Sequence, residues 1–97
     1  MKNQNPEWRA AVEREKDAIL VQFGADVEAI RQMQRLTVGE LAKRAGLSKR
    51  AVVYARKTQG DPKLSTLIAQ FRALGRRLVV TCERLEVSKK GSGSRGV

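Results

Sequence analysis

The sequence has no histidine and only one cysteine, Cys82. A single cysteine cannot form a disulfide within the chain, and the usual zinc-binding spacings of cysteine and histidine are absent. Catalytic triads and general bases that depend on histidine are likewise excluded. No paired-carboxylate motif and no glycine-rich phosphate loop takes their place. We therefore expect neither an enzyme nor a protein that binds a metal or another cofactor.

Long apolar runs and aromatic residues are also scarce. No stretch approaches the roughly 18 apolar residues that cross a bilayer, and the N-terminal residues lack the charged-then-apolar pattern of a secretory leader. We therefore expect a cytoplasmic protein with no membrane partner. Aromatic residues make up only 4% of the 97 residues. This shortage argues against RNA recognition by base stacking.

Acidic residues are half as numerous as basic ones, 10 against 20, so the formal net charge is +10. Residues 1–28 carry a net charge of −2, from six acids and four bases, which leaves +12 for the remainder. Between Leu41 and Gly60 there is no acidic residue. This distribution favours a polyanionic partner, either nucleic acid or, as the alternative, an anionic membrane surface. The basic residues of this interval are Lys43, Arg44, Lys49, Arg50, Arg56 and Lys57.

The stretch from Thr37 to Lys57 predicts two short helices joined by a tight turn. Thr37 and Glu40 have the spacing of a capping box, which predicts the start of the first helix. Gly46 stands where a left-handed residue would end that helix, and Ser48 is a favourable N-cap for the second. With the surrounding basic residues, this pattern indicates a DNA-binding helix-turn-helix. The alternative is an ordinary helical hairpin with a solvated basic face.

The residues before this hairpin predict two further helices. The run Asn5–Glu7 supplies an N-cap, a proline at the first helical position and an acid in the first turn. Gly24 is expected to break or bend the helix that follows, and Asp26 to cap another one reaching about Arg35, with Val27, Ile30 and Met33 inward. We expect the apolar stripe of the first helix to pack on the body of the domain, although a second chain or a protein partner could also cover it. This stripe consists of Trp8, Val12, Ile19 and Phe23.

After the hairpin, Gly60 and Asp61-Pro62 mark a turn, and a further helix is expected to close the core and end at Gly75. The turn is either a plain connection or a place of phosphate contacts beside bound DNA. The apolar stripe of this helix consists of Leu64, Leu67, Ile68, Phe71 and Leu74.

Residues 76–83 alternate in polarity and are rich in β-branched side chains, which predicts a strand. Because no second strand is evident, we expect it to pair antiparallel with the same strand of a second copy across a twofold axis. The alternative is a helical continuation or a frayed extension. The residues expected at this dimer interface are Leu78, Val79, Val80 and Cys82.

Three runs of residues, Ile30–Thr37, Glu40–Ser48 and Asp61–Leu67, resemble the Cro/CI (XRE) helix-turn-helix family over about residues 26–75. The run Ala73–Val80 is similar to the C-terminal strand through which HipB-type antitoxins dimerise. These resemblances imply an all-α, lambda-repressor-like domain with an extra N-terminal helix and a short C-terminal β-strand that pairs across a dimer. The expected organisation is an N-terminal helical extension (1–25), a helix-turn-helix domain (26–75), a dimerisation strand (76–87) and a flexible basic tail (88–97).

The resemblance also implies that the second hairpin helix, at about 48–57, lies in the major groove of double-stranded DNA. The sequence departs from the family at Val38, where many members carry a glutamine that contacts phosphate. The side chains expected to reach base edges are Lys49, Arg50, Val53 and Tyr54. Those expected at phosphates are Thr37, Ser48, Lys57, Thr58, Gln59 and Lys63.

Together these observations predict a sequence-specific DNA-binding transcriptional regulator in the cytoplasm, associated with the nucleoid. It would be a homodimer that binds an inverted repeat and represses by covering a promoter. The alternative is an antitoxin that binds a toxin and also represses its own operon, a reading favoured by the HipB-like strand and the extra N-terminal helix.

Overall fold

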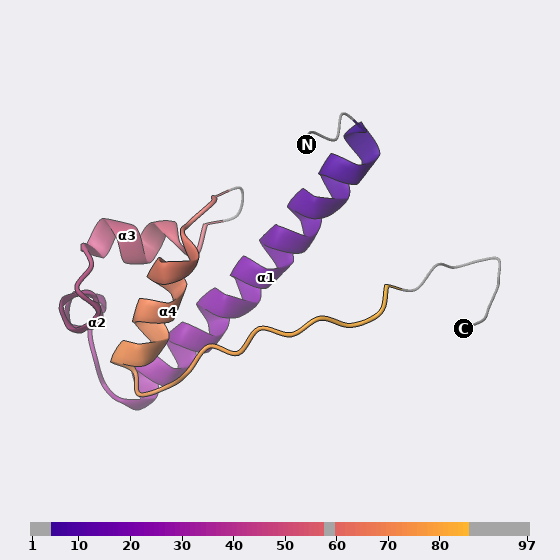
Figure 1. Ribbon diagram of the computed structural model, residues 1–97. Coiled ribbons are helices and arrows are strands. Elements are labelled where there is room, and N and C mark those ends of the chain that lie inside the picture. Colours follow the sequence, from indigo (N-terminus) through magenta and orange to yellow (C-terminus); the bar gives the residue numbers. More distant parts are fainter. Residues whose placement is uncertain (1–4, 58–59, 86–97) are drawn as a thin grey trace.

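The structure is a computed structural model that describes residues 5–57 and 60–85. These residues form four helices and no strand, which confirms the all-α class for this part of the chain. Helix α4 packs against the C-terminal half of α1, helices α2 and α3 pack against α4, and the N-terminal half of α1 projects beyond them (Figure 1). The helices are α1 (Pro6–Met33), α2 (Val38–Ala45), α3 (Lys49–Tyr54) and α4 (Leu64–Ala73).

Helix α1 begins as expected and continues for 28 residues without interruption. Its N-cap, Asn5, accepts hydrogen bonds from the backbone N–H groups of Glu7 (2.8 Å) and Trp8 (3.3 Å). The interruption predicted at Gly24 is wrong, because Gly24 lies buried inside the helix. A glycine costs a helix only about 1 kcal/mol, which packing against neighbouring helices readily offsets. The separate helix expected from Asp26 is therefore the C-terminal end of α1.

The local signals of the hairpin agree with the structure. The Glu40 N–H donates to Thr37 Oγ1 (3.0 Å) and the Thr37 N–H donates to Glu40 Oε1 (2.8 Å), which confirms the capping box. Gly46 ends α2 with φ 72° and ψ 30°, the left-handed conformation that favours glycine. Ser48 Oγ accepts a hydrogen bond from the Ala51 N–H (3.0 Å) and so caps α3. The predicted starts of both short helices are confirmed.

The core lies between the C-terminal half of α1 and the three short helices. Phe23 of α1 and Phe71 of α4 meet edge to face, with ring centroids 5.3 Å apart and an interplanar angle of 89°. Aromatic pairs favour this arrangement because the positive ring edge meets the negative ring face. The buried apolar residues are Phe23, Val27, Leu36, Leu41, Ala42, Val52, Ala55, Phe71 and Leu74, with Leu20 beside them.

Met33 was expected to point inward, but it is 75% exposed. A step of three residues turns the helix by only about 300°, so a spacing of three drifts away from the buried face. Arg35 then adopts a positive φ of 59°, and Leu36, beyond the end of α1, enters the core. The expectation for Met33 was therefore wrong, whereas Val27 is buried and Ile30 packs against the core.

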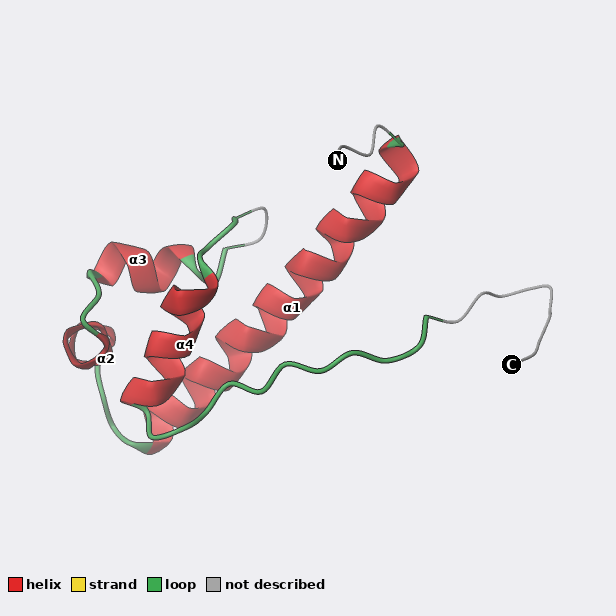
Figure 2. Cartoon of the chain, viewed as in Figure 1, coloured by secondary structure: helices red, strands yellow, loops and turns green. Residues whose placement is uncertain are grey.

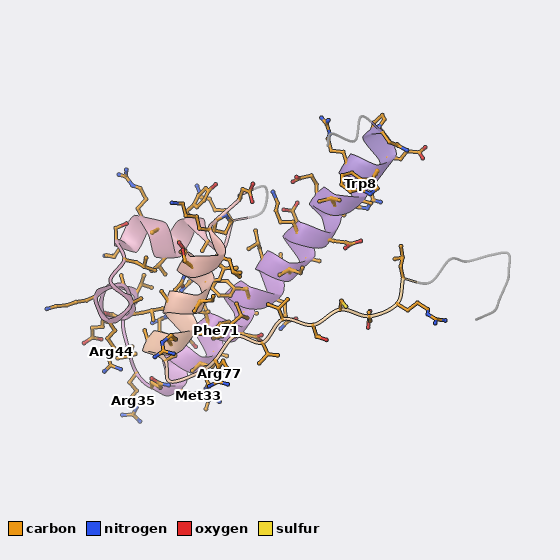
Figure 3. The ribbon with its side chains drawn as sticks, viewed as in Figure 1. Trp8, Met33, Arg35, Arg44, Phe71 and Arg77 are labelled. Atoms are coloured by element: carbon orange, nitrogen blue, oxygen red, sulfur yellow. The ribbon has the colours of Figure 1, made fainter. Side chains whose placement is uncertain are left out.

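The apolar stripe of α1 is divided along its length. Phe23 is buried as expected, whereas Trp8, Val12 and Ile19 are exposed and are not covered by the described part of the chain. Figure 3 shows Trp8 close to the outer end of α1, far from Phe71 in the core. The expectation that the whole stripe packs on the body of the domain was therefore wrong for its outer half.

Helix α4 closes the core through Leu67, Phe71 and Leu74, while Leu64 and Ile68 are exposed. Gly75 follows with φ 78°, as expected for the end of this helix. The next residues, 76–85, form an extended segment that is neither helix nor strand (Figure 2). Leu78, expected at a dimer interface, packs against the core of its own chain, and the residues after it leave the body. A single chain offers this segment no partner for a β-ladder, so the dimer strand stays a prediction. Residues 86–97, which include the expected tail, lie outside the described residues.

Candidate nucleic-acid interface

Helix α3 has one buried and one exposed face. Val52 and the following Ala55 are fully buried, which holds the helix against α2 and α4. The opposite face carries every side chain expected to reach base edges. The structure brings these four together on one exposed surface, which consists of Lys49, Arg50, Val53 and Tyr54.

Lys49 connects this surface with the start of α2. A Cβ atom added to Gly39 would lie 3.8 Å from Lys49 Cδ and 3.8 Å from Thr37 Oγ1, so the Lys49 side chain passes close to the first turn of α2. The capping box occupies the N–H groups of Thr37 and Glu40, which leaves those of Val38 and Gly39 as the unpaired donors of that turn. Backbone N–H groups at a helix start together with an ammonium group favour an anion such as phosphate.

The hydroxyl groups of Thr37 and Ser48, both expected at phosphates, accept capping hydrogen bonds. Each hydroxyl still has its own proton to donate, so a cap can also donate to a phosphate oxygen. Both side chains are exposed, as are Lys57 and Lys63 on either side of the loop between α3 and α4. Thr58 and Gln59, the remaining residues expected at phosphates, lie outside the described residues.

Tyr54 also holds that loop in place. Its hydroxyl oxygen accepts a hydrogen bond from the Asp61 N–H at 2.9 Å. Gly60 is buried beside it, and a Cβ atom there would lie 3.1 Å from the Lys57 carbonyl oxygen and 3.3 Å from that of Tyr54. The Tyr54 hydroxyl therefore positions the segment between Lys57 and Lys63. Part of the Tyr54 ring remains exposed on the surface of α3.

Arg56 is a basic residue of the hairpin that does not contribute to this exposed surface. Its guanidinium Nη1 pairs with Glu28 Oε2 of α1 at 2.5 Å. The other Glu28 oxygen, Oε1, lies 2.6 Å from Arg31 Nη2, and Arg31 Nη1 donates to the carbonyl of Leu36. The carboxylate thus joins α1 to the end of α3. We name the group Glu28, Arg31 and Arg56 the α1–α3 clamp.

Gly24 makes room for the clamp. A Cβ atom on Gly24 would lie 3.4 Å from both Cβ and Cγ of Arg56, so the stem of Arg56 rests against the helix where a side chain is missing. Gly24, Glu28 and Arg31 follow the i, i+4, i+7 spacing of one helix face. That spacing was the available sequence signal, and the interpretation of Gly24 as a helix breaker concealed it.

The clamp changes the acidity of Glu28. Hydrogen bonding to Arg31, with the nearby charge of Arg56, lowers the pKa of Glu28 from 4.5 to about 2, although burial opposes this shift. All three side chains are largely buried, with exposed fractions between 15% and 31%. The ion pairs are therefore less screened by water than a surface pair would be. Glu28 stays charged at neutral pH and links α1 to α3.

Comparison of the chain with protein-family models, with curated proteins and with solved structures found no match. Within residues 5–57 and 60–85, no cluster of three or more acidic, cysteine or histidine side chains could hold a metal ion. In the same part of the chain, no helix has the length and apolar character needed to cross a membrane. The geometry of α2, α3 and the neighbouring loop is therefore the basis for a functional proposal.

Proposed function

We propose that the protein is a sequence-specific regulator that binds double-stranded DNA with α3 in the major groove. The observation that carries this proposal is the exposed face of α3, where Lys49, Arg50, Val53 and Tyr54 lie together and belong to a stretch of sequence without acidic residues. The major groove is wide enough for one helix and presents a distinct pattern at each base pair. The buried face of α3 and the α1–α3 clamp hold the helix at a defined angle to the body.

Arg50 is the best candidate for base readout on this surface. A guanidinium group can donate two hydrogen bonds to O6 and N7 of guanine, and an apolar side chain such as Val53 can contact the methyl group of thymine. Lysines at the edges of the helix and along the loop contact phosphates, which position the protein without reading sequence. This division assigns specificity to Arg50 and Val53, and general affinity to Lys57 and Lys63.

We infer that the DNA-binding form is a dimer paired through residues 76–83. In the described single chain, Val79 and Val80 are largely exposed, as a strand without its partner would leave them. Two copies related by a twofold axis would place their α3 helices in successive major grooves, about 34 Å apart. A dimer on such an inverted repeat covers a promoter and represses by steric exclusion.

Selection of bound sequences from random duplex DNA at physiological salt tests this proposal. Salt screens the phosphate contacts that dominate non-specific binding, whereas base readout persists. We expect enrichment of an inverted repeat whose half-sites are spaced by whole helical turns. The Arg50→Ala variant provides the matched control, and it should lose preference at one position of each half-site. Recovery of random sequence by the wild-type protein would contradict sequence-specific binding.

A further inference from the structure

The outer half of α1 carries an apolar stripe that the described residues leave uncovered. Trp8, Val12 and Ile19 are separated by four and seven residues, so they share one face of the helix. Phe23 continues the same face into the core. One face of α1 is therefore buried at Phe23, where it meets the core, and exposed further out, at Trp8, Val12 and Ile19.

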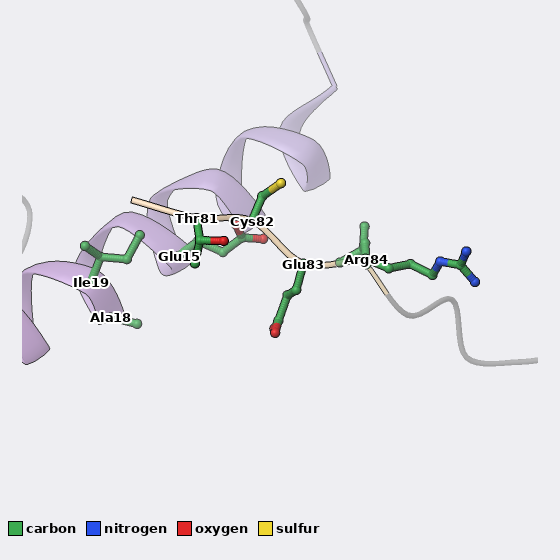
Figure 4. A pocket seen from close by; sticks show the side chains of 8 residues that line it. Glu15, Ala18, Ile19, Thr81, Cys82, Glu83 and Arg84 are labelled. Atoms are coloured by element: carbon green, nitrogen blue, oxygen red, sulfur yellow. The ribbon is translucent and has the colours of Figure 1, made fainter. Parts of the chain in front are cut away.

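A groove runs beside this stripe. Its volume is about 890 Å³, and it lies between α1 and the extended segment after α4. Figure 4 shows the two walls, with Glu15, Ala18 and Ile19 on the helix and the segment Thr81–Arg84 beside it. The groove is therefore bounded on one side by α1, where the carboxylate of Glu15 lies beside the apolar side chains of Ala18 and Ile19, and on the other by exposed backbone.

The backbone wall lacks a partner of its own. The Arg76 N–H donates to the Phe71 carbonyl at 2.8 Å, and no later described residue takes part in a backbone–backbone hydrogen bond. Extended backbone with free N–H and C=O groups is a template for another strand. The same segment of a second copy fits this template, since two identical strands related by a twofold axis pair antiparallel.

Charge also favours a second copy at this place. A chain with a net charge of +10 repels its own copies over most of its surface. Residues 6–19 of α1 are an exception, with four acids against three bases, whereas residues 76–85 carry three arginines against one acid, Glu83. A basic segment of one copy therefore meets the least repulsion when it approaches the outer half of α1 of another.

We propose that the groove takes up residues 79–85 of a second copy, so that the paired strands lie beside Ile19 of the apolar stripe of α1. Leu78 of each copy stays packed against the core of its own chain. The strand of the second copy fills the space between α1 and the chain's own extended segment, and each α1 covers one side of the resulting two-stranded ribbon. This inference rests on the dimer of the proposed function and adds a second contact surface to it. It assigns a role to the extra length of α1, which the DNA-contacting surface does not use.

A pair of substitutions on opposite faces of α1 tests this proposal. Ile19 faces the groove and is 63% exposed, whereas Val21 lies on the other side of the same helix and is 56% exposed. We expect Ile19→Glu to raise the dimer dissociation constant at least tenfold, and Val21→Glu to leave it unchanged. Sedimentation equilibrium over a range of protein concentrations measures both. Circular dichroism checks that both variants keep their helix content, as exposed positions should allow.

The Val80→Pro variant separates this proposal from the strand pairing on which it rests. Proline removes a ladder hydrogen bond, so Val80→Pro should shift the dimer to monomer. A monomeric Val80→Pro together with a fully dimeric Ile19→Glu would overturn the groove and retain the strand. A wild-type chain that stays monomeric, or that assembles only with an unrelated protein, would overturn both. The DNA selection is a separate readout, since a dimer without an enriched motif would contradict sequence-specific binding alone.

Discussion

Arg50 and Lys57 are both basic and exposed, yet the proposed function assigns them different tasks. Arg50 lies on the outer face of α3 among the other candidate base-contacting residues, whereas Lys57 follows that helix at the edge of the loop. A side chain that reads a base edge contributes only on the correct sequence. A side chain at a phosphate contributes on every sequence.

We expect Arg50→Ala to weaken binding to the selected operator by about 1–3 kcal/mol while leaving binding to random DNA largely unchanged. Lys57→Ala should weaken binding to the operator and to random DNA by similar factors. It should also reduce the slope of the logarithm of the binding constant against the logarithm of the salt concentration by about one. Fluorescence anisotropy titrations with operator and random duplexes at several salt concentrations measure these effects. Equal losses on both duplexes for both variants would contradict the assignment of readout to Arg50.

Gly24 gives a second prediction for a single residue. Replacing glycine by alanine inside a helix favours the helix by about 0.5–1 kcal/mol, and the new Cβ atom would only touch Arg56, at 3.4 Å. We expect Gly24→Ala to raise the free energy of unfolding by up to about 1 kcal/mol. Gly24→Leu should lower it by about 1–3 kcal/mol, because the larger side chain displaces Arg56. Urea denaturation measures both, and equal stability of the two variants would contradict the contact.

At the scale of the secondary-structure elements, the α1–α3 clamp is the feature that connects α1 with the end of α3. It joins the long helix to the end of the candidate recognition helix through one carboxylate and two guanidinium groups. Removing the carboxylate would leave Arg31 and Arg56 close together without the charge that balances them. Removing one partner of a partly buried ion pair destabilises a protein more than replacing all of the charged partners by apolar residues does.

We expect Glu28→Gln to lower the free energy of unfolding by about 1–3 kcal/mol at neutral pH. Because the folded-state pKa of Glu28 is depressed from 4.5 to about 2, its contribution is complete above pH 4.5. It is lost as the pH falls from there through 2. The stability of the wild-type protein should therefore decrease over this interval more than that of Glu28→Gln. Chemical denaturation at a series of pH values measures the difference.

Glu13→Gln is the matched control for the clamp variant. Glu13 also pairs with a base on α1, Lys16 at 2.8 Å, but the Glu13 side chain is 55% exposed and the pair lies outside the core. Its removal should leave the stability of the protein nearly unchanged. Similar effects of the two substitutions would show that the clamp stabilises the fold no more than a surface ion pair.

Elements specified by neighbouring residues could be predicted from the sequence, whereas contacts between distant residues could not. The capping box at Thr37, the left-handed Gly46 and the cap at Ser48 involve residues at most three positions apart, and all three agree with the structure. Gly24 was misinterpreted as a helix breaker, because the residue that explains the missing side chain at this position is Arg56, which lies far along the chain. The strand predicted at 76–83 would require a partner that a single chain does not contain.

The candidate site shows the same division. Exposure of Lys49, Arg50, Val53 and Tyr54 follows from the helical periodicity of α3, with Val52 turned inward, so their common face could be predicted. Periodicity alone could not show that Arg56 is withdrawn from the exposed basic surface, because that depends on a carboxylate of another helix. Periodicity also could not show that the Tyr54 hydroxyl oxygen accepts a hydrogen bond from the Asp61 N–H.

At the scale of the whole molecule, charge and apolar surface are separated along its length. The basic hairpin lies at one end, where α2 and α3 pack on α4, and the acidic outer half of α1 extends away from it (Figure 1). The two ends therefore suit different partners, a polyanion at the hairpin and a positively charged chain at the outer half of α1. In the proposed function, DNA binding and self-association use separate surfaces, so that both can occur at the same time.

The division of α1 into a packed and an unpacked half also means that one helix has two local stabilities. In a monomer, the turns from Trp8 to Ile19 lie outside the hydrophobic core, and an isolated helix of this length is marginal in water. Their amide protons should exchange with solvent deuterium through local opening, while those from Phe23 to Ile30 exchange only when the core opens. Native-state hydrogen exchange at low protein concentration would record this gradient, and association through the groove would remove it.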